Sequence, residues 1–224
     1  MRAMILAAGR GERMRPLTDD KPKPLLEAGG KPLIVWTIEA LARSEFRELV
    51  INVSHLGDRI IDALGDGGRW GVTIRYSREA EALETAGGIA TARPFLGHAP
   101  FLVVNADIHS DFDFARGRAA LPPHGDALAH LVLIDNPAHH RAGDFALKAG
   151  LVANEGDPRY TFSGIGVYHP ALFADIPAGS KRQLSAVLRP QIDAGRVTGE
   201  HFAGYWSDIG TPERLSALDR RLRL

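Results

Sequence analysis

The first half of the chain contains four short apolar runs separated by stretches with helical spacing. The runs cover residues 3–8 (AMILAA), 49–54 (LVINVS), 72–77 (VTIRYS) and 101–106 (FLVVNA). Strands that are apolar almost throughout and that alternate with helices indicate a largely parallel sheet with helices on both faces. The sequence therefore predicts an α/β fold with a mostly parallel central sheet. In such sheets ligands bind beyond the carboxyl ends of the strands, so we expect a functional site in the loops after these runs.

Helices are expected where apolar residues recur with helical spacing between a typical start and stop. Four stretches fit this pattern: residues 32–44, 58–64, 181–195 and 211–222. Pro32 and Pro212 suit a helix start, and Thr211 is a typical N-cap. Gly65 ends the second stretch, and Pro190 interrupts the third. Further strands are expected at residues 127–135 and 162–170. We find no repeat or linker, and we expect a single domain over residues 1–224.

Composition restricts the classes of function. Lys+Arg and Asp+Glu number 27 each, so no overall field favours nucleic acid or an anionic membrane, and we expect neither as a partner. No apolar run approaches the roughly 20 residues that span a bilayer, and no charged-then-apolar leader opens the sequence. The absence of cysteine removes disulfides and thiolate chemistry. The expected location is the cytoplasm.

The loop after the first run is rich in phosphate-binding residues and poor in core residues. This opening loop (residues 6–24) reads LAAGRGERMRPLTDDKPKP. Glycines let backbone N–H groups approach a phosphate, and arginine and lysine add positive charge. The Gly-Lys-Ser/Thr of a P-loop is missing, and Met14 stands where a dinucleotide fingerprint needs its third glycine. On composition alone, a solvated basic turn explains the stretch equally well. The candidate phosphate-binding residues are Ala7, Ala8, Gly9, Gly11, Arg13 and Lys23.

The stretch LAAGRGERMRPLTDDKPKPLLEAGGKPLI resembles the signature of sugar-1-phosphate nucleotidylyltransferases, L-A-A-G-x-G-T-R-x-x-P-L-T-x-x-x-P-K-P-L, and departs from it mainly at Glu12. The resemblance implies a Rossmann-like nucleotidyltransferase fold and an enzyme that joins a nucleoside triphosphate to a sugar 1-phosphate. Residues 135–147 (DNPAHHRAGDFAL) and 161–173 (TFSGIGVYHPALF) look most like the short bacterial N-acetylmuramate 1-phosphate uridylyltransferases of peptidoglycan recycling. That likeness implies UTP as the donor and UDP-N-acetylmuramic acid as the product.

The resemblance also implies a magnesium site. Asp107 follows the fourth apolar run, and Asp208 lies in YWSDIGT before the last helix. Taken alone, each aspartate is more commonly a turn or cap residue. The family places metal ligands in an N-G-D element and in a W-x-D-x-G-T element, which NAD and WSDIGT resemble. The implied ligands of Mg²⁺ are therefore Asp107 and Asp208, since this hard ion prefers carboxylates, water and substrate phosphates.

A second nucleotide element is expected near residue 85. The segment EALETAGGI resembles the family's P-L-G-T-A-G element, with Glu84 in place of the usual glycine. On the residues alone, a capped helix start is the preferred interpretation of ETAGGI. Glu79 or Glu81 is expected to accept a hydrogen bond from a base N–H. The implied base and ribose contacts are Leu83, Thr85, Gly87 and Gly88.

The implied reaction is attack of the sugar phosphate on the α-phosphorus of the triphosphate, with release of pyrophosphate. The acceptor phosphate is largely dianionic at pH 7, so no general base is needed. By resemblance, Arg13 contacts the β- and γ-phosphates, Lys23 contacts the α-phosphate and the transition state, and Gly9 and Gly11 offer backbone N–H groups. Residues up to about 110 would bind the nucleotide, and residues 111–224 the sugar.

The acceptor side is less defined. The family's second lysine, in an E-K-P element, has no counterpart here, and Arg159 is the only stand-in. Residues 139–141 (HHR) are expected either to attract a lactyl carboxylate or to be ordinary surface. The expected sugar contacts are Asn105, Gly143 and Asp144.

Two alternatives stay open at this stage. One is a mannose-1-phosphate guanylyltransferase, which shares the opening motifs. The other is a non-catalytic nucleotide-binding subunit, against which the presence of Lys23, Asp107 and Asp208 counts.

Overall fold

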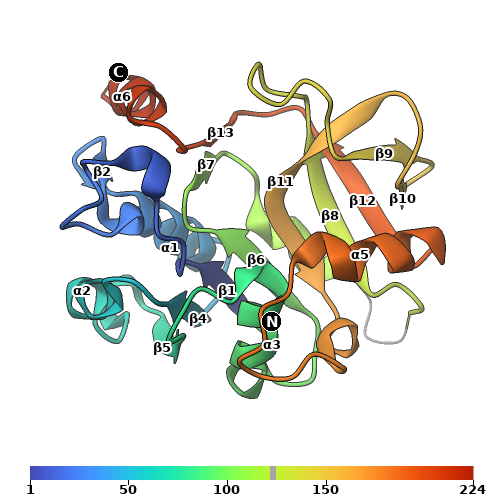
Figure 1. Cartoon of the computed structure of the whole chain (residues 1–224), viewed down its shortest axis with the longest axis horizontal. Helices are drawn as coiled ribbons and strands as arrows, with labels where there is room; N and C mark the ends of the chain where they lie inside the picture. The colour runs from blue at the N-terminus through green and yellow to red at the C-terminus, as the bar shows by residue number, and fades with distance from the viewer. Residues whose placement is uncertain (122–124, 224) are drawn as a thin grey trace.

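The computed structural model describes residues 1–121 and 125–223, and its centre is a nine-stranded sheet with helices on both faces (Figure 1). The strands of this sheet are β1 (Ala3–Leu6), β4 (Glu48–Val53), β5 (Thr73–Arg78), β6 (Phe101–Asn105), β8 (Ala129–Ile134), β9 (Phe145–Lys148), β10 (Leu151–Ala153), β11 (Arg159–Tyr168) and β12 (Val197–Phe202). Two small sheets pair β2 (Glu27–Ala28) with β3 (Lys31–Pro32), and β7 (Ile108–Ser110) with β13 (Trp206–Asp208). The α-helices are α1 (Leu33–Arg43), α2 (Gly57–Leu64), α3 (Glu84–Leu96), α4 (Gly117–Ala120), α5 (Leu184–Asp193) and α6 (Pro212–Leu222).

The four apolar runs of the first half form the parallel part of the sheet, in the order β5-β4-β1-β6. Side chains alternate along each strand, so each strand contributes to a core on both faces. Ala3 and Ile5 pack in one core with α1 and α2, whereas Met4 packs in the other with α3 and α5. The expected α/β fold with helices on both faces is thereby confirmed.

The far half of the sheet is mixed rather than parallel. β8 and β12 run parallel, but β11 lies antiparallel between β6 and β8. The chain reverses just before β11, because β9 and β10 form a hairpin across Ala149 and Gly150. Both turn residues have positive φ, 50° and 81°, as a tight two-residue hairpin turn requires. The sequence analysis missed these two short strands because the turn lacks the usual Asn-Gly or Asp-Gly.

The helix ends follow the sequence signals. Thr211 caps α6 by accepting a hydrogen bond from the Arg214 backbone N–H at 3.4 Å. Gly65 ends α2 with a φ of 60°, and Pro190 lies inside α5. A third, smaller core beneath α6 includes Met14 of the opening loop and Leu218. The last helix therefore anchors the segment that carries Asp208 against the opening loop.

A crevice arises at the carboxyl end of β1, because the connections to the strands on its two sides cross opposite faces of the sheet. α1 and α2 connect β1 to β4 and β5 on one face, and α3 then returns on the other face to β6, on the opposite side of β1. In a doubly wound sheet, ligands usually bind at the point where the strand order reverses in this way.

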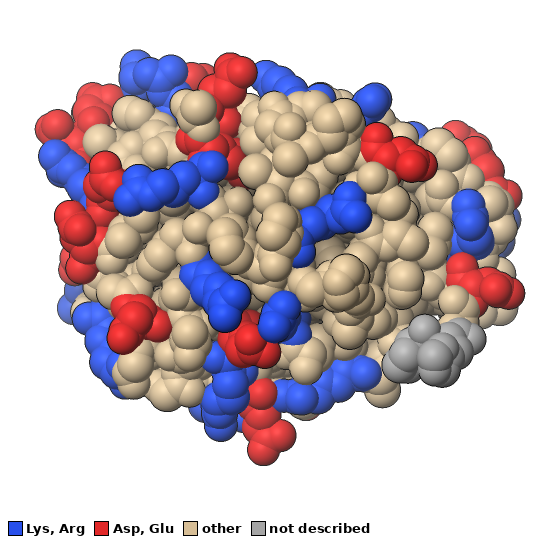
Figure 2. Space-filling view, turned by 90° about the horizontal axis from the view of Figure 1, so that it is seen from below, with Lys and Arg blue, Asp and Glu red and all other residues tan. Residues whose placement is uncertain are grey.

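The molecular surface carries charges of both signs. On the face shown in Figure 2, basic and acidic side chains are interspersed, in keeping with the equal totals of the sequence. Among the described residues, no helix combines the length and the apolar character that crossing a membrane demands.

Candidate active site

A cavity of about 510 Å³ lies at the carboxyl end of β1 and its neighbouring strands. It is open to solvent on one side, and its wall is formed by the opening loop, the ends of β4 and β6 and the start of α3. Of the candidate binding and catalytic residues, eleven line it: Ala7, Ala8, Gly9, Gly11, Arg13, Lys23, Glu79, Leu83, Thr85, Asn105 and Asp107. The other candidates are not among the described lining residues: Glu81, Gly87, Gly88, Gly143, Asp144 and Asp208.

The opening loop keeps its shape through a glycine that no other residue replaces without strain. Gly11 has a φ of +67°, and a Cβ atom there would lie 3.0 Å from the Lys23 Cβ and 3.1 Å from the Thr18 Cγ2. The Thr18 hydroxyl donates to the Gly11 carbonyl at 2.9 Å. Gly9 differs, because a Cβ there would meet nothing within 4 Å. The backbone at Gly9 thus faces open space, where a phosphate has room to approach.

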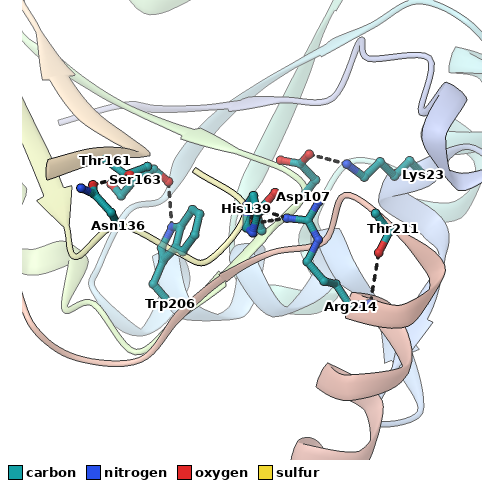
Figure 3. Close-up of polar contacts among 10 residues, drawn as sticks. Lys23, Asp107, Asn136, His139, Thr161, Ser163, Trp206, Thr211 and Arg214 are labelled. Atoms are coloured by element: carbon teal, nitrogen blue, oxygen red, sulfur yellow. Dashed lines mark hydrogen bonds and ion pairs between the residues drawn. The ribbon is translucent and has the colours of Figure 1, made fainter. Parts of the chain in front are cut away.

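Lys23 pairs with Asp107 across the cavity wall (Figure 3). The Lys23 side chain is only 11% exposed, and the Asp107 side chain is 34% exposed. The prolines on either side of Lys23 restrict the backbone, and the ion pair with Asp107 holds the ammonium group in place before any ligand binds. The pair combines a fixed cation with a carboxylate that water still reaches.

A buried polar network supports the floor of the cavity. The Asn52 side chain accepts from the Ala7 N–H at 2.8 Å and donates to Glu79 Oε1 at 2.7 Å. Glu79 Oε2 accepts from the Leu83 N–H at 3.0 Å. Burial raises the pKa of the Glu79 carboxyl above its usual value, and the two hydrogen bonds oppose that rise. The sequence analysis missed Asn52, although a polar residue inside the run LVINVS was a visible signal.

The start of α3 is both a helix start and part of the cavity wall. Glu84 has a φ of 61°, a left-handed conformation that glycine adopts without steric cost, in keeping with the glycine of the element that this segment resembles. Gly87 lies beneath residues 180–182: its N–H donates to the Arg182 carbonyl at 3.1 Å, and a Cβ atom there would lie 2.2 Å from the Ser180 carbonyl oxygen. Gly88 packs against Glu79, with its Cβ position 2.7 Å from Oε1. Both glycines therefore permit close packing, whereas Leu83 and Thr85 face the cavity.

The two expected metal ligands come together through the pairing of β7 with β13. Asp208 lies opposite Ile108 in this ribbon, and the Ile209 N–H donates to the Asp107 carbonyl at 2.7 Å. The described residues contain no group of three or more His, Cys, Asp and Glu side chains arranged to hold an ion. Two carboxylates nevertheless suit Mg²⁺, which commonly takes one or two from the protein and fills its other positions with water and substrate phosphates. The residues present thus fit the expected ion.

Asp208 already has two basic side chains beside it, Arg214 and His139. Its Oδ1 accepts from Arg214 Nη1 at 2.5 Å and lies 3.1 Å from His139 Nε2. Arg214 Nη1 also lies 2.9 Å from His139 Nε2, and Figure 3 shows the Arg214 side chain pointing from α6 toward His139. Sequence reasoning missed Arg214 because an arginine in the first turn of an amphipathic helix looks like ordinary surface.

The polar groups expected on the sugar side make several contacts within the protein. Asp144 Oδ1 lies 3.0 Å from His140 Nε2, and Oδ2 accepts from the Phe162 N–H at 2.8 Å. The Arg159 guanidinium donates to three backbone carbonyls at 2.7–3.3 Å, those of Ala142, Asp144 and Asn154. Gly143 has a φ of +63°, and a Cβ there would lie 2.8 Å from Asn136 Oδ1. These residues fix the shape of residues 136–144, which we name the acceptor loop.

The cavity lies where the strand order reverses, and its wall combines a glycine-containing basic loop with Asp107, while Asp208 follows on the adjoining ribbon. These are the features of a site for phosphate transfer. The chain belongs to the nucleotidyl transferase family, whose model matches residues 2–145.

Individual relatives narrow this assignment. The chain is 51% identical over 222 residues to the N-acetylmuramate alpha-1-phosphate uridylyltransferase of Neisseria meningitidis serogroup B, covering 96% of this chain and 95% of that protein. It is 30% identical over 235 residues to the mannose-1-phosphate guanylyltransferase catalytic subunit beta of Danio rerio, covering 95% of this chain but 62% of that protein. A solved structure from Bacillus anthracis, described as a glucose-1-phosphate thymidylyltransferase, superposes with a TM-score of 0.87 at 22% identity and covers 100% of this chain and 95% of its own, which shows a shared fold.

Proposed function

We propose that the protein transfers the uridylyl group of UTP to N-acetylmuramate 1-phosphate, giving UDP-N-acetylmuramic acid and pyrophosphate. The observation that carries this proposal is the 51% identity, over nearly the full length of both chains, to a protein with that activity in its name. The likeness to the guanylyltransferase is weaker and covers a smaller part of that protein. We place the reaction in the cytoplasm as a step of peptidoglycan recycling.

In this reaction an oxygen of the sugar phosphate forms a bond to the α-phosphorus, and the bond between the α-phosphorus and the bridging oxygen breaks. Pyrophosphate leaves with that oxygen. The attacking phosphate is largely dianionic at pH 7, so the site must position two anions and neutralise charge rather than remove a proton. The cavity supplies a rigid cation, open backbone and carboxylates within one wall.

The residues of the opening loop receive the triphosphate in this proposal. Arg13 lines the cavity and binds the β- and γ-phosphates, and the backbone at Gly9 and Gly11 contacts the nucleotide. Lys23, held against Asp107, binds the α-phosphate and stabilises the negative charge that grows there in the transition state. Asp107 and Asp208 hold Mg²⁺, which when bound stabilises charge on the reacting phosphates.

The base and the sugar lie at opposite ends of the cavity in this proposal. Leu83 and Thr85 contact the base and ribose, and Glu79 accepts from a base N–H while it keeps its bonds to Asn52 and Leu83. Asn105 contacts the sugar directly. Gly143 and Asp144 act through the shape of the acceptor loop. The whole chain then works as one domain, with the nucleotide part in residues 1–110 and the sugar part in residues 111–224.

A substrate matrix tests the proposal. UTP, dTTP, GTP and CTP are each combined with the 1-phosphates of N-acetylmuramate, N-acetylglucosamine, glucose and mannose, and product and pyrophosphate are followed by phosphorus NMR. We expect the highest turnover for UTP with N-acetylmuramate 1-phosphate, and only with a divalent cation. Preference for GTP with mannose 1-phosphate would contradict the substrate assignment. Nucleotide binding without turnover in any combination would contradict catalysis itself.

A further inference from the structure

The acceptor phosphate needs a cation that the opening loop does not supply. In the proposed function, on which this inference rests, a nearly dianionic sugar phosphate approaches a triphosphate that is also negatively charged. Unless positive charge lies between or behind them, their repulsion opposes binding of the second substrate. Arg10, Arg13 and Lys23 line the cavity from the loop that the proposed function assigns to the triphosphate, and Lys23 is already paired with Asp107.

Arg159, the stand-in suggested by the sequence, is engaged elsewhere. Its Nε, Nη1 and Nη2 atoms each donate to a backbone carbonyl. Together these three hydrogen bonds connect the acceptor loop with residue 154. Moving it to a ligand would break these three bonds. A cation whose donors are less occupied is a better candidate.

We propose that Arg214 binds the phosphate of the sugar 1-phosphate. Its side chain is 21% exposed, so it is held in place yet reachable. Among the described residues, its hydrogen bonds to Asp208 and His139 use only Nη1. Nη2 lies 2.5 Å from where a Cβ of Gly210 would stand, and Gly210 lines the cavity. The guanidinium thus lies against the rim of the cavity, with Nε and Nη2 available as a planar fork for phosphate oxygens.

The neighbours of Arg214 favour a phosphate over the lactyl carboxylate of the sugar. Arg214 contacts Asp208, which lies on β13, and β13 pairs with β7 directly after Asp107. In the proposed function, the carboxylates of Asp107 and Asp208 mark where the reacting phosphates gather. The lactyl group is attached to the sugar ring, farther from the reacting oxygen than the phosphate itself. Arg214 therefore acts on every sugar 1-phosphate that the enzyme accepts.

The test compares Arg214→Gln with Arg220→Gln, which removes the same charge from an exposed position on the same helix. We expect Arg214→Gln to raise the KM for N-acetylmuramate 1-phosphate about tenfold or more, the size of one lost charge-assisted hydrogen bond. The KM for UTP should change less than about twofold, and Arg220→Gln should leave both constants unchanged. Arg214→Lys keeps the charge but loses the planar fork, so its KM for N-acetylmuramate 1-phosphate should lie between those of the wild type and Arg214→Gln. This variant preserves the test if Arg214→Gln fails to fold.

A binding measurement supplies a readout apart from turnover. Calorimetric titration of N-acetylmuramate 1-phosphate into protein saturated with Mg²⁺ and the α,β-methylene analogue of UTP should show the same weakening in Arg214→Gln alone. If instead the KM for UTP or the Mg²⁺ requirement rises while sugar-phosphate binding is unchanged, Arg214 only positions Asp208 and the proposal fails. A defect with N-acetylmuramate 1-phosphate but not with N-acetylglucosamine 1-phosphate would assign Arg214 to the lactyl carboxylate, which also overturns it.

These outcomes stay separate from the fate of the proposed function. If the substrate matrix shows that the wild-type protein prefers another sugar 1-phosphate, the function assignment fails. The Arg214 comparison then runs with that substrate, because the phosphate group is common to all of them.

Discussion

The opening loop lines the cavity and the acceptor loop contacts Arg214 through His139, yet the two loops use their polar groups in opposite ways. In the opening loop, Gly9 faces open space and Arg13 lines the cavity, so neither is needed to hold the fold. In the acceptor loop, Asp144 contacts His140 and accepts a hydrogen bond from the Phe162 N–H. The Arg159 guanidinium donates to three backbone carbonyls, two of them in this loop. One loop presents its chemistry to a ligand, and the other uses similar residues to keep its own shape.

This difference explains why residue type alone is a poor guide to function. A buried or half-buried polar group must find a partner, and a long loop without regular strands finds many of its partners within itself. A polar residue is a strong functional candidate when it lines a cavity and the fold does not depend on it. The predictions below test this distinction for each loop.

The largest effect is expected for Lys23→Ala. The Lys23 ammonium is the buried cation of the cavity wall, and its loss should lower kcat about 10²–10³-fold, as removal of one preorganised charge-stabilising group does in other enzymes. Because Asp107 remains about one third exposed to water, thermal unfolding should change little. Lys21→Ala is the matched control, since Lys21 pairs with Glu27 at the surface of the same loop. Wild-type kcat in Lys23→Ala would remove the central role proposed for this loop.

The same contrast shows what the sequence could reveal. The parallel strands were predictable because each is a short apolar run, and the opening loop was recognisable because it keeps residues such as Gly11 and Lys23 that build little core. Pairing between distant segments was not predictable from local patterns, and the joint role of Asp107 and Asp208 came only from the family resemblance. Only the ribbon of β7 and β13 places Asp208 beside Asp107, and only the packing of α6 brings Arg214 to His139. Both depend on contacts between residues about 75 to 100 positions apart, which local patterns do not encode.

The second prediction concerns Arg159→Met on the acceptor side. This change leaves three loop carbonyls without their charged donor, so the free energy of unfolding should fall by about 1–3 kcal/mol. Urea unfolding measures the loss, and Lys148→Met, at an exposed position on neighbouring β9, serves as the control. If Arg159→Met keeps its stability but raises the KM for the sugar phosphate, Arg159 is the acceptor cation. The contrast between the two loops would then be wrong.

The smallest effects, and the sharpest comparison, are expected for two glycines of the opening loop. Gly11→Ala places a side chain at a φ of +67° and within 3.0 Å of the Lys23 Cβ, so it should lower the free energy of unfolding by about 1–2 kcal/mol. Gly9→Ala meets no atom within 4 Å and lies outside the left-handed region, so it should leave stability unchanged or raise it by about 0.4–1 kcal/mol, because alanine restricts the unfolded chain. Its new methyl group faces the cavity, however, and should raise the KM for UTP about fivefold, equivalent to about 1 kcal/mol of lost binding. Stability and nucleotide binding should therefore separate at positions two residues apart; a Gly9→Ala protein with unchanged KM for UTP would show that the triphosphate does not approach the backbone there.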